Sequence, residues 1–165
     1  MKKETASTFG LLSILLCLLP INDVFAAGTV TVCDEGNLRA ALAGGGLVTF
    51  AADGTITLTN TLVITNNTTI DASGHTITLS GGNAVRLFLV NTGVSAAFFN
   101  LTLANGRHAG SNGVYVFPTP TDGQPGYGGA ILNYGTLALT GCLVQSNRAV
   151  GGIGVTNAPV AFSGT

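Results

Sequence analysis

From residue 47 onward, apolar and polar residues alternate in short runs. Every second position in these runs is Ile, Leu, Val or Phe, and Thr fills many of the positions between them. Such alternation is typical of β-strands with one buried face. The runs with this pattern are 48–50, 55–58, 62–65, 69–71, 76–79, 86–90 and 97–103. We therefore expect an all-β protein built from many short strands.

Turn-forming residues separate the runs, as in Asp53-Gly54, Asn66-Asn67 and Ser73-Gly74. A β-sandwich would need longer strands joined by two-residue hairpins. A β-solenoid uses very short strands and corners in the left-handed conformation, where Asn and Gly cost least. Because the strands are short and the corners are Asn, Gly and Asp, we favour the solenoid over the sandwich.

The sequence contains one internal repeat. Residues 98–107 resemble residues 139–148 at a fixed offset. This offset fits two coils of about 20 residues, or a single coil that carries an insert. A fixed offset of either kind is typical of a stacked architecture.

One helix is expected before the strands begin. Residues 34–43 start with acidic residues and Asn, and Leu38, Ala41 and Leu42 fall on one face. Three consecutive glycines at 44–46 end the helix. We interpret residues 37–43 as a cap over the N-terminal end of the stack, where strand edges would otherwise be exposed.

The segment 110–129 interrupts the alternation with repeated Gly and Pro. It is predicted to be a long loop that leaves one corner of a coil and contains Tyr115, Phe117 and Tyr127. Long loops on rigid scaffolds often carry function. These aromatic side chains would either stack on sugar rings or pack the loop against the stack, and we favour packing.

Residues 1–26 have the pattern of a signal peptide. Lys2 and Lys3 precede an apolar run at 9–19, and Val24-Phe25-Ala26 fits a signal peptidase site. The run is shorter than the roughly 20 residues that cross a bilayer. We expect cleavage after Ala26, a secreted or cell-surface protein, and no membrane span in residues 27–165.

The composition of the chain argues against two classes of binding partner. Charged residues make up 8% of the chain, the net charge is −1, and no basic run follows Lys3. This balance argues against nucleic acid and against anionic membrane surfaces as partners. Cys33 and Cys142 lie far apart in a stacked fold, so we favour two thiols over a disulfide.

Several segments resemble known exported β-helices. Residues 38–42 followed by 48–50 and 55–58 look like the N-terminal cap and first coil of bacterial exported parallel β-helix proteins, and 69–74 is similar to a turn common in pectate-lyase-like β-helices. Residues 128–137 resemble the Gly-Gly-Ala-Ile repeat of polymorphic outer-membrane proteins.

The resemblance implies that residues 27–165 form a right-handed parallel β-helix. It also implies a C-terminal edge left open at Thr165, which further coils or a partner would cover. The superfamily includes lyases, hydrolases and adhesins, so the resemblance selects no activity.

The sequence offers few candidate catalytic residues. A lyase of this kind would need carboxylates that hold calcium and a basic side chain, and an inverting hydrolase would need paired carboxylates. Acidic residues are scarce after position 26: Asp34, Glu35, Asp53, Asp71 and Asp122. Asp71, with Arg86 about one coil away, is the best candidate, but we favour Asp71 as a turn former that binds the backbone near Ser73.

The two histidines, His75 and His108, are expected to be solvated corner residues, and neither has a Ser, Cys or carboxylate neighbour that suggests a nucleophile. We assign no catalytic, binding or metal-ligating residue and no cofactor. The expected function is structural, adhesive or surface-binding, with carbohydrate or another cell-surface ligand as partner. The alternative is a polysaccharide lyase or glycoside hydrolase, and we favour the non-catalytic role.

Overall fold

The computed structural model describes residues 28–116 and 119–155. The expected signal peptide at 1–26 and Phe117 therefore lie outside the described residues. The helix is α1 (Glu35–Leu42). The strands are β1 (Gly28–Val30), β2 (Gly46–Phe50), β3 (Gly54–Thr57), β4 (Leu62–Ile64), β5 (Thr68–Asp71), β6 (Ile77–Ser80), β7 (Phe88–Val90), β8 (Ser95–Phe99), β9 (Leu101–Ala104), β10 (Arg107–Ala109), β11 (Ile131–Asn133), β12 (Thr136–Thr140), β13 (Leu143–Gln145) and β14 (Arg148–Val150).

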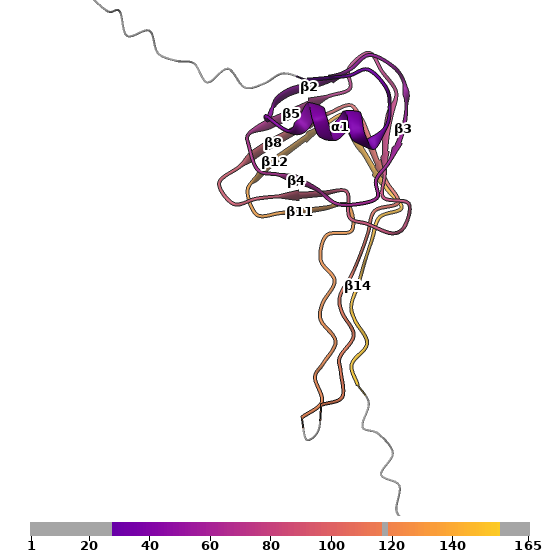
Figure 1. Ribbon diagram of the computed structural model, residues 1–165, viewed down its shortest axis with the longest axis vertical. Coiled ribbons are helices and arrows are strands. Elements are labelled where there is room, and N and C mark those ends of the chain that lie inside the picture. Colours follow the sequence, from indigo (N-terminus) through magenta and orange to yellow (C-terminus); the bar gives the residue numbers. More distant parts are fainter. Residues whose placement is uncertain (1–27, 117–118, 156–165) are drawn as a thin grey trace, which may run out of the picture.

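Every strand pair in the described residues is parallel. The sheets have the orders β1-β2-β5-β8-β12, β3-β6-β9-β13, β4-β7-β11 and β10-β14. From β2 onward the chain visits the first three sheets in turn and then returns to the first, and we call each such turn a circuit. The strands β10 and β14, which follow β9 and β13, form the fourth sheet. Each strand from β2 to β10 thus pairs with the strand one circuit later. Figure 1 shows β2, β5, β8 and β12 following one another in this way. The prediction of an all-β protein is confirmed, with parallel sheets and one helix.

Alternation along each strand builds columns of apolar side chains between the sheets. Val48 pairs with Ile70, Ile70 with Phe98, and Phe98 with Leu139. The first three are fully buried, whereas Leu139 is 42% exposed. Phe98 also contacts Phe88 across the interior, with 4.6 Å between ring centroids. The core is therefore continuous through the first circuits and uncovered at the last described one.

The pairing decides between the two explanations of the internal repeat. Leu139 pairs with Phe98 and Arg148 with Arg107, so the repeated segments lie on adjacent circuits. The repeat offset is therefore one circuit that carries an insert. No strand occurs among the described residues between Ala109 and Ile131, which agrees with the loop predicted at 110–129.

The corners use residues that tolerate positive φ. Asn100 has a φ of 57° and splits the run 97–103 into β8 and β9, so this run does not form a single strand. At the matching position one circuit later, Gly141 has a φ of 64°. Asn and Gly adopt this conformation at least cost because other side chains clash with the backbone there.

The helix α1 lies across the area that the strands enclose (Figure 1). Its N-cap is Asp34, whose carboxylate accepts a hydrogen bond from the Asn37 N–H at 2.7 Å. Leu38 is fully buried in the core. The Glu35 carboxylate accepts hydrogen bonds from the backbone N–H and the hydroxyl of Thr59, at 2.9 and 2.8 Å. These bonds tie the helix to the corner between β3 and β4.

Cys33 and Cys142 are free thiols, as favoured from the sequence. Each is half-buried, and each donates to a backbone carbonyl: Cys33 to Ala52 at 3.2 Å and Cys142 to Phe98 at 3.3 Å.

We expect alanine substitutions at Phe98 and Leu139, which pair on adjacent circuits, to lower stability by different amounts. Phe98→Ala should lower the free energy of unfolding by about 3–5 kcal/mol, because it leaves a cavity in a closed core. Leu139→Ala, one circuit later, should cost less than about 2 kcal/mol, because its side chain is already partly hydrated. Urea unfolding followed by circular dichroism measures both, with Phe98→Leu as a milder substitute should the alanine variant not fold. Equal losses at the two positions would contradict the open last circuit.

The Glu35 carboxylate, which anchors α1, predicts that the stability of the fold depends on pH. Burial raises the pKa of Glu35, but the hydrogen bonds from Thr59 and Arg39 outweigh it and lower the pKa from 4.5 to about 2. Because the folded pKa lies below the unfolded one, Glu35 stabilises the fold above pH 4.5, and this contribution disappears as the pH falls towards 2.

Glu35→Gln should therefore lower the urea midpoint at pH 7, and its difference from the unmodified protein should shrink as the pH falls from 4.5 towards 2. Asp122→Asn is the control, because its side chain forms no hydrogen bond within the described residues. A difference that stays constant with pH would show that the ionised carboxylate does not anchor the helix.

Candidate functional site

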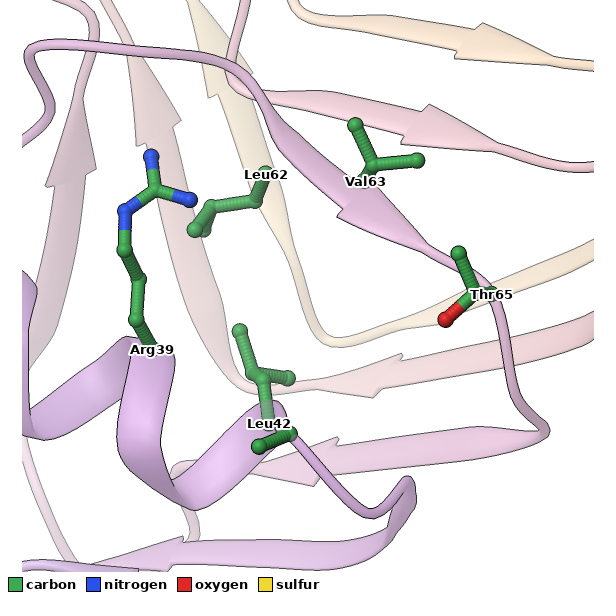
Figure 2. A pocket seen from close by; sticks show the side chains of 6 residues that line it. Arg39, Leu42, Leu62, Val63 and Thr65 are labelled. Atoms are coloured by element: carbon green, nitrogen blue, oxygen red, sulfur yellow. The ribbon is translucent and has the colours of Figure 1, made fainter.

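The clearest hollow in the described residues lies between α1 and β4. It is lined by Arg39 and Leu42 of the helix and by Leu62, Val63 and Thr65, and Figure 2 shows the Leu62 side chain near that of Arg39. Its volume is about 140 Å³, well below the roughly 300 Å³ at which pockets for small organic ligands begin. Arg39 donates to Glu35 and to the carbonyl of Asn60, both at 2.6 Å. The hollow is therefore a shallow gap between the helix and β4. Arg39, the only charged residue that lines it, is already paired with Glu35.

Asp71 holds a turn, as the sequence favoured. Its carboxylate accepts from the Ser73 hydroxyl at 2.6 Å and from the Ser73 N–H at 2.8 Å. These two bonds lower the pKa of Asp71. Arg86 does not join it: the guanidinium donates to the carbonyls of Tyr127 and Gly128, at 2.7 and 2.8 Å. The Asp71 and Arg86 pair considered for a lyase is therefore not assembled.

The structure brings His75 to the Asp53 carboxylate, a contact that sequence reasoning did not identify. Asp53 Oδ1 lies 2.9 Å from His75 Nδ1 and accepts from the Thr76 N–H at 3.0 Å. The Thr76 bond, followed by the His75 bond, lowers the pKa of Asp53. The two residues lie on consecutive circuits, so only the offset between β3 and β6 could have revealed the contact.

A histidine oriented by a carboxylate resembles a general base. Such a base needs a nucleophile or an acidic proton within reach. The neighbouring hydroxyl, Ser73 Oγ, donates instead to Asp71 and accepts from Asn100 Nδ2 at 2.8 Å. The Asp53 side chain is 67% exposed. The pair fixes a surface corner, and no hydroxyl or thiol is bonded to it within the described residues.

His108 has a structural contact as well. Its Nδ1 accepts from the Tyr127 N–H at 3.2 Å, which joins the two sides of the insert at its base. Burial, followed by the nearby charge of Arg86, lowers the pKa of His108. The neutral form is thus the one that accepts this hydrogen bond.

The insert forms a stem that projects from the sheets (Figure 1). Three extended segments lie side by side in it: 107–116, 119–129 and 148–155. The first and third run in the same direction, because β10 and β14 pair in parallel. The second runs back alongside the first, as shown by the bonds from Thr121 N–H to the Val114 carbonyl and from Gln124 N–H to the Ser111 carbonyl.

The three segments bond to one another in a ring. The Gly110 N–H of the first segment donates to Val150 of the third at 2.9 Å. The Gly152 N–H of the third donates to Gln124 of the second at 2.8 Å, and the Gln124 N–H donates to Ser111 of the first at 2.8 Å. Backbone groups that would otherwise lack a protein partner are therefore satisfied within the stem.

Glycine at every third position makes this packing feasible. Gly123, Gly126 and Gly129 are each partly covered, and the two residues after Gly123 and the one after Gly126 are exposed. A side chain on any of these glycines would overlap the backbone of the third segment. A period of three with glycine at the crowded positions also characterises collagen, whose chains approach closely for the same reason. Sequence reasoning recorded the glycines as loop signals and missed their period.

Apolar side chains point outward from the stem. Tyr115 and Tyr127 are 52% and 57% exposed. The interpretation that these tyrosines pack the loop against the stack is therefore wrong, and Phe117 lies outside the described residues. The other large apolar side chains exposed on the stem are Val114, Val116 and Ile153.

Two further observations concern the described residues alone. Residues 28–116 and 119–155 contain no helix that is long and apolar enough to span a membrane. In the same ranges, no three His, Cys, Asp or Glu side chains gather as a metal site would require.

No family model, curated protein or solved structure matches this chain. The resemblance to exported β-helix proteins thus remains a prediction, and the functional assignment depends on the geometry of the stem and the corners.

Proposed function

We propose that residues 27–165 form a right-handed parallel β-helix that is exported by residues 1–26 and acts as a secreted or cell-surface binding protein. Support for the architecture comes from the circuit through three sheets and from the parallel, in-register pairing of every strand with the next circuit. The low charge and the alternation of Thr with apolar residues agree with such a stack.

The observation that carries the proposed role is the stem. It projects from a rigid scaffold, backbone hydrogen bonds join its three segments, and many of its side chains face solvent. Clustered exposed apolar side chains mark interaction sites more often than other surface. Tyr115 and Tyr127 add amphipathic rings, which suit carbohydrate or another cell-surface ligand.

The acidic residues support a non-catalytic role over the lyase or hydrolase alternative. Asp34 caps α1, Glu35 anchors it, Asp53 holds the Thr76 turn and Asp71 holds the Ser73 turn. Asp122, the remaining acidic residue after position 26, is exposed on the stem. Each of the first four already performs a local structural task, and together with Asp122 they do not converge on one cleft.

Removing the stem tyrosines should weaken ligand binding. The double variant Tyr115→Ala, Tyr127→Ala should bind immobilised polysaccharide or bacterial surfaces at least about fivefold more weakly, as expected when aromatic anchors worth more than about 1 kcal/mol are lost. Tyr134→Ala is the matched control, because Tyr134 is 59% exposed but lies outside the stem. Equal affinities for the double variant and the unmodified protein would refute binding through the stem.

The enzymatic alternative has its own assay. Residues 27–165 are incubated with acidic and neutral polysaccharides, with and without calcium, and unsaturated products and reducing ends are measured. We expect no turnover. Activity that disappears in Asp71→Asn or His75→Ala would replace the binding role with a catalytic one.

A further inference from the structure

Three of the four arginines in the sequence occupy equivalent positions on consecutive circuits. The Arg107 N–H donates to the carbonyl of Val85, and the Arg148 N–H donates to that of Gly106, both at 2.8 Å. These bonds align Arg86 with Arg107, and Arg107 with Arg148, which also pair in the register of β10 and β14. Neighbouring parallel strands lie about 4.8 Å apart. The register therefore gathers three cations at one corner, where the stem begins.

The three arginines have different surroundings. Arg86 is buried, and its guanidinium donates to two backbone carbonyls at the base of the stem. Arg107 and Arg148 are exposed. Within the described residues, the hydrogen bonds of arginine side chains all come from Arg39 and Arg86. The guanidinium groups of Arg107 and Arg148 thus have no acceptor in this part of the chain.

No described carboxylate balances this exposed pair. Among residues 28–116 and 119–155, the carboxylates in ion pairs are Glu35 and Asp53, and each has a different partner. The acidic residues outside these ranges, Glu4 and Asp23, both belong to the expected signal peptide. Like charges that stand opposite each other on neighbouring strands destabilise a sheet. An anion that bridges the two guanidinium groups would remove this repulsion.

The two exposed side chains share an open face. Paired residues of parallel strands project to the same side of the sheet, and successive residues project to opposite sides. His108 faces the second stem segment, because it accepts from the Tyr127 N–H. Arg107 and Arg148 therefore project away from that segment. Ala109, the next residue on this face, is small and exposed, so a ligand has room beside the pair.

The chemistry of the pair selects the kind of anion. A guanidinium presents two parallel N–H groups that match two oxygens of an oxyanion. Two neighbouring guanidinium groups would compete for the two oxygens of a carboxylate, whereas a phosphate or sulfate monoester has three free oxygens. Two exposed cations in a chain of net charge −1 are few for the long backbone of a nucleic acid.

We propose that Arg107 and Arg148 bind a sulfate or phosphate monoester group of a polysaccharide. The inference rests on the proposed surface-binding role and names the ligand class for it. Such a polysaccharide contacts the scaffold at the base of the stem, in addition to any contact with the stem tyrosines.

Chemically matched dextrans test the pair. Dextran sulfate and dextran phosphate, or one of them, should bind at least about tenfold more tightly than dextran and carboxymethyl dextran, as measured by biolayer interferometry at one salt concentration. Arg107→Gln and Arg148→Gln should each weaken this binding about threefold, and the double variant about tenfold. Neither should lower the urea midpoint, because each removes a like-charge contact.

Arg39→Gln is the matched control, because it removes the same charge from a side chain that is paired with Glu35 at another corner. Its affinity for dextran sulfate and dextran phosphate should equal that of the unmodified protein. An equal loss in Arg39→Gln would overturn the inference, since net charge alone would then explain the binding. Unchanged affinity in the Arg107 and Arg148 variants would overturn it too.

Two other ligands decide the specificity. Equally tight binding of carboxymethyl dextran or of duplex DNA would overturn the inference, because the pair would then be a general site for polyanions. The Tyr115→Ala, Tyr127→Ala variant tests the surface-binding role separately. That role survives, and the arginine site falls, if dextran sulfate and dextran phosphate fail to bind while bacterial surfaces are still bound through the tyrosines.

Discussion

The structure depends on one constraint, which is parallel pairing in register between each circuit of the chain and the next. Because Val48, Ile70 and Phe98 stand opposite one another, a slip by one residue would turn every buried side chain of that strand outward. The same register places Gly141 next to Asn100 at a left-handed corner and continues into the stem, where it aligns Gly110 with Gly151. The core, the corners and the stem thus all follow from a single alignment.

The few charged residues mostly serve this alignment. Glu35 joins the helix to one corner, Asp53 joins His75 to the preceding circuit, and Arg86 holds the base of the stem through two backbone carbonyls. These are contacts between neighbouring circuits or elements, and each of these charged side chains is already engaged in one of them. Exposed apolar and aromatic side chains occur on the stem, as at Tyr115 and Tyr127, and also on the strands, as at Val63 and Leu143.

Local patterns were enough to predict the helix and the strands between residues 46 and 104, but not β1 or the strands from β10 onward. Alternation with a period of two located strands such as 62–65 and 69–71, because a strand with one buried face must alternate. Contacts between circuits could not be predicted without the register: Asp53 and His75 lie on consecutive circuits, and no local pattern marks their pairing. The corner at Asn100 was missed because alternation continues on both sides of it. In the stem, the glycines at every third position carried the signal, but a search for strands and helices does not test that period.

The period of three also determines how such a stem can change in length. Inserting or deleting one full period in each segment keeps every glycine at a crowded position, whereas a shorter change brings a side chain against a neighbouring backbone. An extended segment spans at most about 3.6 Å per residue, so each step of three residues alters the reach by at most about 11 Å. Loop closure costs only about 0.6 kcal/mol for each doubling of length, so these steps leave the stack nearly as stable as before. Evolution can therefore adjust the distance between the scaffold and its outermost residues in discrete increments while the register of the strands stays the same.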